Sequence, residues 1–449
     1  MWLAESNFWM SMILGSSLCL SPLANTLRLN REEGAVLVPS GVHNYALAQE
    51  GSTLYVSWTQ RFGREASTVL AQVDLGKSEV REVFRSEPKA GVCLSPVLSV
   101  FKGRLELAWI LRHRREEGAY YQIEFLSWNE SDQKSFRRES LDYGAHPGSI
   151  RLFSNSEHLF LVGVSKKREK TPGMSIRLYG KSESGWRSLP VPSGKETFYD
   201  HQPTLFYGPG HWQLGWIRDG SVCVSRSLDG LDWSEPQQLS GKGATATNFV
   251  STADGPTLGW VEQKGRALEL HLATSADGAS WAHLPASDRF EGNRLRFEFG
   301  ATRNALKYLI YHYWSDEDQC ERVEFAIIGR DWKRIRLDES QDQACGRSLK
   351  PVVLMEDNRL YVAWQERRGR NSAIAMNYTD FPWVEWLPVY TVVASGDESN
   401  VQVAPKLVSG PQGIFLTYFT FRQSRAPIQK QVQHGDLMLQ SLELGSSNN

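Results

Sequence analysis

The sequence predicts an all-β protein in which a four-stranded unit is repeated along the chain. Three observations predict it. Apolar runs that end in an aromatic residue recur about every 50 residues, with almost no helical periodicity between them. A proline stands 13 positions before four of these aromatic residues, and the motif Ser-x-Asp-Gly-x-x-Trp occurs twice. Short strands repeated at this spacing are typical of a β-propeller, whose blades bury their faces against one another.

We call the residue that ends the apolar second strand of each unit its anchor. The anchors are Trp58, Trp109, Trp216, Trp260, Tyr311, Trp364 and Tyr418, and Gly163 takes this position in one unit. Pro96, Pro203, Pro351 and Pro405 precede four of them. The runs before the anchors are rich in the β-branched and aromatic residues that suit packed strands. Eight anchor positions predict eight blades, with seven or six as alternatives.

The chain divides into four parts. Residues 1–24 contain an apolar run from Phe8 to Ala24, which fits a secretory signal peptide or an N-terminal anchor. Residues 25–34 form a polar leading segment, residues 35–445 the propeller and residues 446–449 a tail. The last unit has only three predicted strands, so its fourth strand is missing. We therefore expect the run from Ala35 to Val38 to supply the missing strand and close the ring, which removes exposed edges.

Composition narrows the classes of function. The net charge of −1 argues against a nucleic-acid binder. Nothing in the cysteine spacing predicts a metal site, and no cofactor is expected. Cys320 and Cys345 fall in loops of the same predicted face, so we expect a disulfide between them in an exported protein. After signal cleavage, we expect the mature protein to be a periplasmic or extracellular monomer without a membrane span.

The two motif copies predict hairpin turns, because an alternating apolar run precedes each of them. An Asp carboxylate can accept backbone N–H groups across its own turn, Gly accepts a positive φ, and Trp covers apolar surface. The residues that define the copies are Ser227, Asp229, Gly230, Trp233, Ser275, Asp277, Gly278 and Trp281. We therefore expect each copy to join two strands of one blade.

This motif resembles the Asp-box, or BNR repeat, of the sialidase-like β-propellers, in its shorter form. In that family the motif joins the third and fourth strands of a blade on the face opposite the active site, so the resemblance implies a structural role. Weaker copies span residues 180–186 and 377–383. Sialidases have six blades and hold the substrate carboxylate with three arginines, the first in an Arg-Ile-Pro segment. The nearest segment here, Leu37-Val38-Pro39, lacks that arginine, which argues against sialidase activity.

The face opposite the motif is predicted to be basic. Taken together, the loops that join second to third strands contain more Lys and Arg than Asp and Glu when the sixth unit is left out. The loop of the sixth unit is acidic and contains Asp316, Glu317, Asp318 and Glu321. The best-placed cations follow the anchors closely and are Arg61, Arg112, Lys166, Arg218 and Arg367. Arginine pairs bidentately with carboxylate or sulfate, so these residues predict a rim that binds an anionic ligand.

Four further residues are candidates for sugar contacts or for acid–base catalysis. Tyr199, Asp200 and His201 lie in a loop before a first strand, the strand expected to line the central channel. Glu262 follows the anchor Trp260 closely. The chemistry of these residue types fits general acid–base work.

Three functions follow from these patterns. The first is a non-catalytic propeller that binds a carbohydrate or another acidic ligand on its basic face. The second is a glycoside hydrolase, which needs two carboxylates about 5–10 Å apart at the mouth of the channel. The third is a protein-interaction scaffold, because a fold alone does not determine function.

Overall fold

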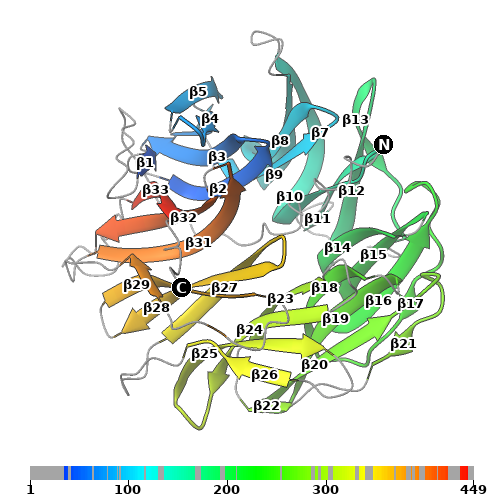
Figure 1. Ribbon diagram of the computed structural model, residues 1–449. Coiled ribbons are helices and arrows are strands. Elements are labelled where there is room, and N and C mark those ends of the chain that lie inside the picture. The colour runs from blue at the N-terminus through cyan, green and yellow to red at the C-terminus, as the bar shows by residue number, and fades with distance from the viewer. Residues whose placement is uncertain are drawn as a thin grey trace.

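The computed structural model describes most of the predicted propeller. The residues it describes are 35–38, 42–62, 65–77, 79–87, 89–90, 93–115, 118–129, 136–166, 173–192, 198–208, 210–252, 255–284, 289–291, 295–301, 307–328, 333–338, 347–368, 371–380, 386, 390–393, 400–411, 413–422 and 435–442. They form strands and turns without a helix, and Figure 1 shows their sheets arranged around a common centre. The chain is an all-β propeller, as the sequence predicts.

The strands follow one another with short connections. In the first half of the chain they are β1 (Ala35–Val38), β2 (Val42–Glu50), β3 (Thr53–Phe62), β4 (Glu65–Asp74), β5 (Glu79–Arg85), β6 (Lys89–Ala90), β7 (Cys93–Phe101), β8 (Arg104–Arg115), β9 (Gly118–Trp128), β10 (Phe136–Ser154), β11 (Leu159–Lys166), β12 (Ser175–Ser182), β13 (Gly185–Leu189), β14 (Asp200–Gly208), β15 (His211–Arg218), β16 (Ser221–Ser227) and β17 (Gln237–Gln238). In the second half they are β18 (Ala244–Thr252), β19 (Gly255–Lys264), β20 (Ala267–Thr274), β21 (Ala282–His283), β22 (Arg289–Glu291), β23 (Leu295–Ala301), β24 (Lys307–Ser315), β25 (Cys320–Ile328), β26 (Lys333–Arg336), β27 (Arg347–Glu356), β28 (Arg359–Arg368), β29 (Asn371–Asp380), β30 (Tyr390–Val393), β31 (Asn400–Gly410), β32 (Gly413–Arg422) and β33 (Gly435–Leu442).

The described strands form antiparallel sheets that each begin with an inner strand. Six sheets have a four-strand path: β2-β3-β4-β5, β14-β15-β16-β17, β18-β19-β20-β21, β23-β24-β25-β26, β27-β28-β29-β30 and β31-β32-β33-β1. The first strands of consecutive sheets, such as β14, β18, β23, β27 and β31, contact one another and so form the inner ring. Figure 1 shows the other strands of each sheet lying outward from them.

The remaining sheet has seven strands in the order β7-β8-β9-β10-β11-β12-β13. Its central strand β10 pairs with β9 up to Gly144 and with β11 from Ala145 onward. Gly144 has a φ of 108°, and a side chain there would collide with the carbonyl oxygen of Lys166. We interpret this sheet as two repeat units that share β10.

The N-terminal run closes the ring. Residues Ala35 and Val36 of β1 pair with Leu439 and Met438 of β33, so that the last sheet gains its outer strand from the start of the chain. The tyrosine Tyr45 of β2 adds a second link, because its hydroxyl donates to the Ala404 carbonyl oxygen of β31 at 2.8 Å. The closure expected from the sequence is confirmed.

The recurring prolines mark bulges in the inner strands. Gln202, Lys350 and Ala404 each precede such a proline, and their φ values are 49°, 51° and 54°. The pairing register shifts at each of these points, for example between His201 and Thr204. Proline has no N–H to donate to a neighbouring strand, so it is accepted where a bulge interrupts the ladder.

The anchors form the core between blades. Their exposed fractions run from 0% to 3%, and they pack among leucine, valine and isoleucine side chains from two neighbouring sheets. Gly163 stands where the other units have an aromatic anchor, and the reason is steric. A Cβ atom at Gly163 would collide with the hydroxyl of Tyr143, a residue of β10 that is 1% exposed. Tyr143 therefore fills the space that an aromatic anchor occupies in the other units.

The two Ser-x-Asp-Gly-x-x-Trp segments form local turns at the ends of β16 and β20. The Asp229 Oδ1 atom accepts the backbone N–H groups of Leu231 and Asp232 at 2.8 and 3.0 Å. Asp277 Oδ1 does the same for Ala279 and Ser280, both at 2.8 Å. Each turn thus binds its own backbone, as the sequence predicts for this motif.

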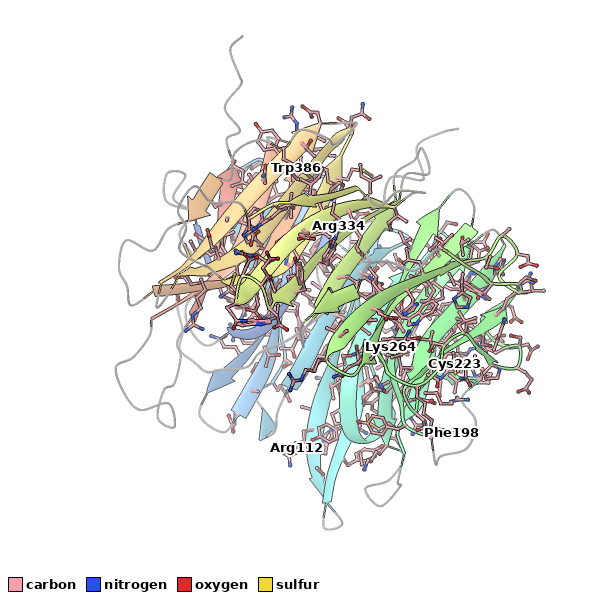
Figure 2. The ribbon with its side chains drawn as sticks, turned by 90° about the horizontal axis from the view of Figure 1, so that it is seen from below. Arg112, Phe198, Cys223, Lys264, Arg334 and Trp386 are labelled. Atoms are coloured by element: carbon pink, nitrogen blue, oxygen red, sulfur yellow. The ribbon has the colours of Figure 1, made fainter. Side chains whose placement is uncertain are left out.

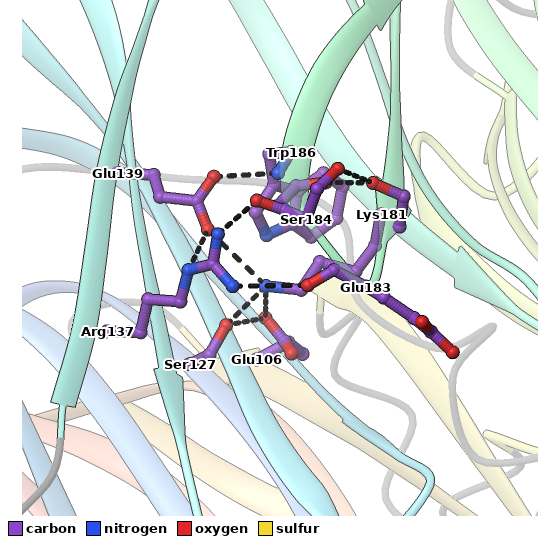
Figure 3. A network of polar contacts seen from close by, with 10 residues as sticks. Glu106, Ser127, Arg137, Glu139, Lys181, Glu183, Ser184 and Trp186 are labelled. Carbon is purple, nitrogen blue, oxygen red and sulfur yellow. Dashed lines mark hydrogen bonds and ion pairs between the residues drawn. The ribbon is translucent and has the colours of Figure 1, made fainter.

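The weaker copy at residues 180–186 is a different structure, which we call the Lys181 hairpin (Figure 3). Lys181 Nζ donates to Ser127 Oγ at 2.5 Å and lies 3.4 Å from Glu106 Oε2 and 3.7 Å from Glu139 Oε1. The backbone N–H of Trp186 also donates to Glu139, at 2.7 Å. These contacts join the third blade to β8, β9 and the first part of β10. The other weak copy, residues 377–383, extends outside the described residues.

Candidate functional site

The two faces of the propeller follow from its strand order. The loop face holds the ends of second strands and the starts of first strands, and the turn face holds the Ser-x-Asp-Gly-x-x-Trp turns. Figure 2, which views the molecule at 90° to Figure 1, places Arg112 and Phe198 toward its lower side and Trp386 toward its upper side. Trp386 lies between the third and fourth strands of its sheet, so these residues mark opposite faces.

The second strands extend past their anchors, which corrects the expected position of the basic residues. Arg61 lies in β3, Arg112 in β8 and Arg367 in β28, and each is paired with a third-strand residue. They were expected in loops. Strand pairing continues because the hairpins of these blades extend beyond the packed core, and it places these residues on the rim of the sheet rather than in its loops.

Asp200 and Arg218 form a buried ion pair at the start of the fourth blade. They are direct partners across β14 and β15, and Arg218 Nε lies 2.8 Å from Asp200 Oδ1. Asp200 is 1% exposed, and burial raises its pKa although the hydrogen bond from Arg218 lowers it. The guanidinium carbon of Arg218 also lies 4.8 Å from the Phe198 ring centroid and 5.1 Å from that of Trp216. Both charges are therefore engaged within the fold.

Tyr199 is an exposed aromatic residue on this face. Its exposed fraction is 49%, and its ring centroid lies 5.7 Å from that of His201. The backbone holds it firmly, because Tyr199 N donates to Asp219 Oδ1 at 2.9 Å and Tyr199 pairs with Met174 of the third blade. Burial lowers the pKa of the half-buried His201, which keeps its imidazole neutral near pH 7. A fixed aromatic ring beside a neutral imidazole can contact a sugar ring.

Glu262 lies on β19 and is engaged by its own blade. It is 8% exposed and accepts a hydrogen bond from the Trp260 indole N–H at 2.9 Å. His271 Nε2 lies 3.6 Å from Glu262 and 3.4 Å from Glu269, and its ring stacks on Trp260. Asp200 and Glu262 make no direct contact with each other. Each is held by a side chain of its own sheet, Asp200 by Arg218 and Glu262 by Trp260.

Of the other predicted cations, two are half-buried and one is exposed. Arg112 is half-buried, and its Nε atom has no hydrogen-bond partner among the described residues. Lys166 is also half-buried and ends β11, beside the blade that holds Tyr199. Arg367 is exposed. The side chain of Arg61 lies outside the described residues.

The acidic sixth loop is partly neutralised. Asp318 Oδ2 accepts a hydrogen bond from Arg322 Nε at 2.8 Å, which lowers the pKa of Asp318. Glu321 is 3% exposed, whereas Asp316 and Glu317 are exposed. Cys320 is disulfide-bonded, and Cys345 falls outside the described residues, so the predicted pairing of these two stays a prediction.

Sequence reasoning missed two features near this site. The Asp200–Arg218 pair could have been found from strand register, since both residues flank a hairpin of predictable length. The sequence reasoning also missed Arg151 of β10 and Glu298 of β23. Each of them pairs with the residue that directly precedes the anchor of its unit. In the part of the chain that the structure describes, no His, Cys, Asp and Glu side chains gather in threes as a metal ion requires. That part also has no helix with the length and apolar character of a membrane span.

Comparison with known proteins supports the fold. No protein-family model matches the sequence, and no curated protein matches it. Among solved structures, the chain is similar to Sqt1 from Chaetomium thermophilum, with a TM-score of 0.52, 10% identity, and 90% of this chain and 97% of that chain covered. It is also similar to a prolyl endopeptidase, with a TM-score of 0.50 and 11% identity over 87% of this chain. The likeness spans 55% of the prolyl endopeptidase chain. The polysaccharide lyase Uly1 has a TM-score of 0.47, 10% identity, and 96% and 100% coverage. At such identity, the likenesses to Sqt1 and to the prolyl endopeptidase show a shared fold alone.

Proposed function

We propose that the protein is a non-catalytic binder of an acidic carbohydrate on its loop face. The observation that supports this most directly is the contrast between Tyr199 and the candidate catalytic carboxylates. Tyr199 exposes 49% of its surface, while Asp200 and Glu262 expose 1% and 8%. A hydrolase needs two available carboxylates facing the substrate. A binding site needs an exposed aromatic surface and cations for the acidic group.

Tyr199 supplies a fixed platform for the sugar ring, and Lys166 is the predicted cation on the neighbouring blade. Arg112 and Arg367 extend the basic rim. Arg218 is not expected to bind the ligand, because it is paired with Asp200 and lies against Phe198. It stabilises the segment that carries Tyr199. We also infer that the two Ser-x-Asp-Gly-x-x-Trp turns are Asp-boxes of a sialidase-like propeller, since their carboxylates bind their own backbone on the opposite face.

Binding to a glycan array tests the proposal. The array contains sialylated, sulfated and uronic-acid glycans, and binding is measured at low and high salt. We expect acidic glycans to bind, with an affinity that falls as salt rises. Tyr199→Ala should weaken binding about tenfold. Leu228→Ala is the matched control, because Leu228 is 70% exposed on the opposite face.

Each other outcome points to a different function. Release of bound glycan through cleavage would contradict the non-catalytic proposal and support the glycoside hydrolase. Absence of binding at both salt concentrations would reject the carbohydrate ligand and favour a protein-interaction scaffold. Equal loss of binding in Tyr199→Ala and Leu228→Ala would reject the loop face as the site.

We further propose that the protein is exported as a monomer. The apolar run from Phe8 to Ala24 supports export, and it falls outside the described residues. Mass spectrometry of the protein from the cell exterior or periplasm tests this. A chain that begins near residue 25 is expected, and a full-length chain confined to the cytoplasm would contradict export.

A further inference from the structure

The inner ring holds one equivalent residue from every blade. In each first strand it is the residue paired with the neighbour that directly precedes the anchor. The eight residues are Ala46, Val97, Arg151, Thr204, Asn248, Glu298, Val352 and Lys406. Because their cross-strand pairing is equivalent, they lie at one level of the ring. We call them the inner-ring residues.

These residues share a direction as well as a level. Side chains two positions apart on a strand point to the same side. Phe206, Val250 and Val408 lie two positions after Thr204, Asn248 and Lys406, and they pack against the next blade around the ring. The inner-ring residues therefore all lean from their own blade toward the following one, beside the centre.

Four consecutive inner-ring residues form a polar arc: Arg151 of β10, Thr204 of β14, Asn248 of β18 and Glu298 of β23. These four strands contact one another in this order. Arg151, Asn248 and Glu298 are half-buried, although Ile150 and Leu152 beside Arg151 are buried. Thr204 is 2% exposed, so solvent reaches the polar arc at Arg151, Asn248 and Glu298.

The rest of the ring differs from the polar arc. Val352, Ala46 and Val97 are apolar. Lys406 is already engaged, because its Nζ donates to the Tyr45 carbonyl oxygen at 3.1 Å and lies 4.0 Å from the Tyr45 ring centroid. Burial lowers the pKa of Lys406 to about 7. The available polar groups are therefore gathered on one side of the ring.

Arg151 and Glu298 sit at the two ends of the arc and influence each other's charge. Burial lowers the pKa of Arg151 and raises that of Glu298 to about 7, and the attraction between them opposes both shifts. Among the described residues neither side chain forms a hydrogen bond or a close ion pair. A half-buried guanidinium without a hydrogen-bond partner is a receptor for a carboxylate, since its paired donors match the two oxygens.

We propose that the polar arc is a second ligand site, in which Arg151 binds the carboxylate of a uronic acid and Asn248 contacts its hydroxyl groups. The ligand class rests on the proposed function, whereas the residues are distinct from those of the loop face. The bound carboxylate takes the place of Glu298 as the counter-charge of Arg151. The Glu298 carboxylate then lies near the negatively charged carboxylate of the ligand, and it binds a proton because this avoids the repulsion between the two.

This arrangement makes binding depend on pH. Arg151 of β10 and Tyr308 of β24 interact electrostatically with Glu298. The neighbouring strands also carry His312 on β24 and Lys350 on β27, and the described residues of β18 carry no titratable group. With a pKa of about 7, Glu298 is largely protonated at about pH 6 and largely ionised at about pH 8. Only the protonated form accepts the ligand anion without repulsion. Affinity should therefore fall about tenfold between these two values.

Calorimetry with glucuronate as the probe and glucose as the uncharged control tests the site in the full chain. We expect glucuronate to bind more tightly than glucose, and about tenfold more tightly at about pH 6 than at about pH 8. Arg151→Gln should weaken glucuronate binding at least about tenfold at both values. Glu298→Gln should bind at about pH 8 as tightly as the natural protein does at about pH 6. Arg104→Gln, an exposed cation on the turn face, should change nothing.

The outcomes separate this site from the loop face. Equal binding of glucose and glucuronate would overturn the proposal, as would an unchanged pH dependence in Glu298→Gln. Glu298→Gln decides the matter if Arg151→Gln fails to fold, because the natural protein already holds a neutral side chain at position 298 below its pKa. Glucuronate binding that survives Arg151→Gln but is lost in Tyr199→Ala would place the ligand on the loop face, leaving the proposed function intact and rejecting this inference.

Discussion

The Lys181 hairpin and the turn at Ser275–Trp281 occupy the same place in their blades but are stabilised differently. Both join the third and fourth strands. In the turn, Asp277 is exposed, and its carboxylate is satisfied by N–H groups two and three residues away. In the hairpin, Lys181 has a side chain that is 9% exposed, and its partners Glu106 and Ser127 belong to the second blade. One structure satisfies its charge locally, and the other depends on its neighbour.

This difference determines what a substitution should cost. A buried charge that loses its partner has no access to water, so the remaining charge is strongly destabilised. An exposed carboxylate loses little, because water replaces its hydrogen bonds. The repeat thus preserves a position in the fold while the source of its stability changes from one blade to another.

The largest expected effect is that of Lys181→Met. It leaves Glu106, whose pKa is already raised by burial, beside Glu139 without the cation that joins them. We expect the free energy of unfolding to fall by about 3–5 kcal/mol in urea denaturation. Lys181→Met combined with Glu106→Gln should recover part of the loss. The exposed Lys242→Met serves as control, and equal loss in both single variants would show that the hairpin is not an ionic junction.

Gly278→Ala should have the next largest effect, because it disturbs the contact between the turn and the fourth blade. Gly278 has a φ of 67°, and a Cβ atom there would collide with side-chain atoms of Gln213 and His211. The Gly278 carbonyl oxygen also accepts a hydrogen bond from Gln213 at 3.0 Å. Strain and overpacking together should cost about 2–4 kcal/mol of unfolding free energy.

Gly265→Ala is a matched control for this change. Gly265 has a φ of 66°, but nothing lies within 4 Å of a Cβ atom placed there. Only the backbone term remains, so we expect a loss of about 1 kcal/mol. If the two alanine variants unfold at the same urea concentration, packing of the turn against the fourth blade contributes nothing to stability.

The repeat and its local turns were predictable from sequence, because the interactions that produce them are short in range. The anchors, the bulge-marking prolines and the backbone bonds of Asp229 each depend on a few neighbouring residues. Closure by Ala35–Val38 was predictable for a different reason, since an incomplete last blade requires a strand and only the N-terminal run was unassigned. The strand β10 was not anticipated as a shared element, because its two halves pair with different sheets.

The ionic contacts could not be predicted in the same way. Lys181 and Glu106 are separated by three strands in the chain, and their proximity depends on how two blades pack. The Arg151–Glu298 pair joins strands that are not neighbours in any sheet. For the loop face, the sequence predicted basic residues, but only strand register shows that Arg218 is committed to Asp200.

The smallest expected effect is that of Asp277→Asn, and its signature is pH dependence rather than size. Hydrogen bonds from the backbone N–H groups of Ser280 and Ala279 lower the pKa of Asp277 to about 2. A lowered pKa means that the ionised carboxylate stabilises the folded protein at pH values above its pKa in the unfolded chain, which is about 4. This contribution to stability is lost as the pH falls toward 2.

Melting temperatures measured from about pH 5 to about pH 2 should therefore drop less steeply in Asp277→Asn than in the natural protein. Asp232→Asn removes an exposed carboxylate at the equivalent turn that accepts no backbone hydrogen bond from the described residues, and it should keep the natural slope. If Asp277→Asn also keeps that slope, the carboxylate contributes no pH-dependent stability, and the turn is held by its glycine and its packing alone.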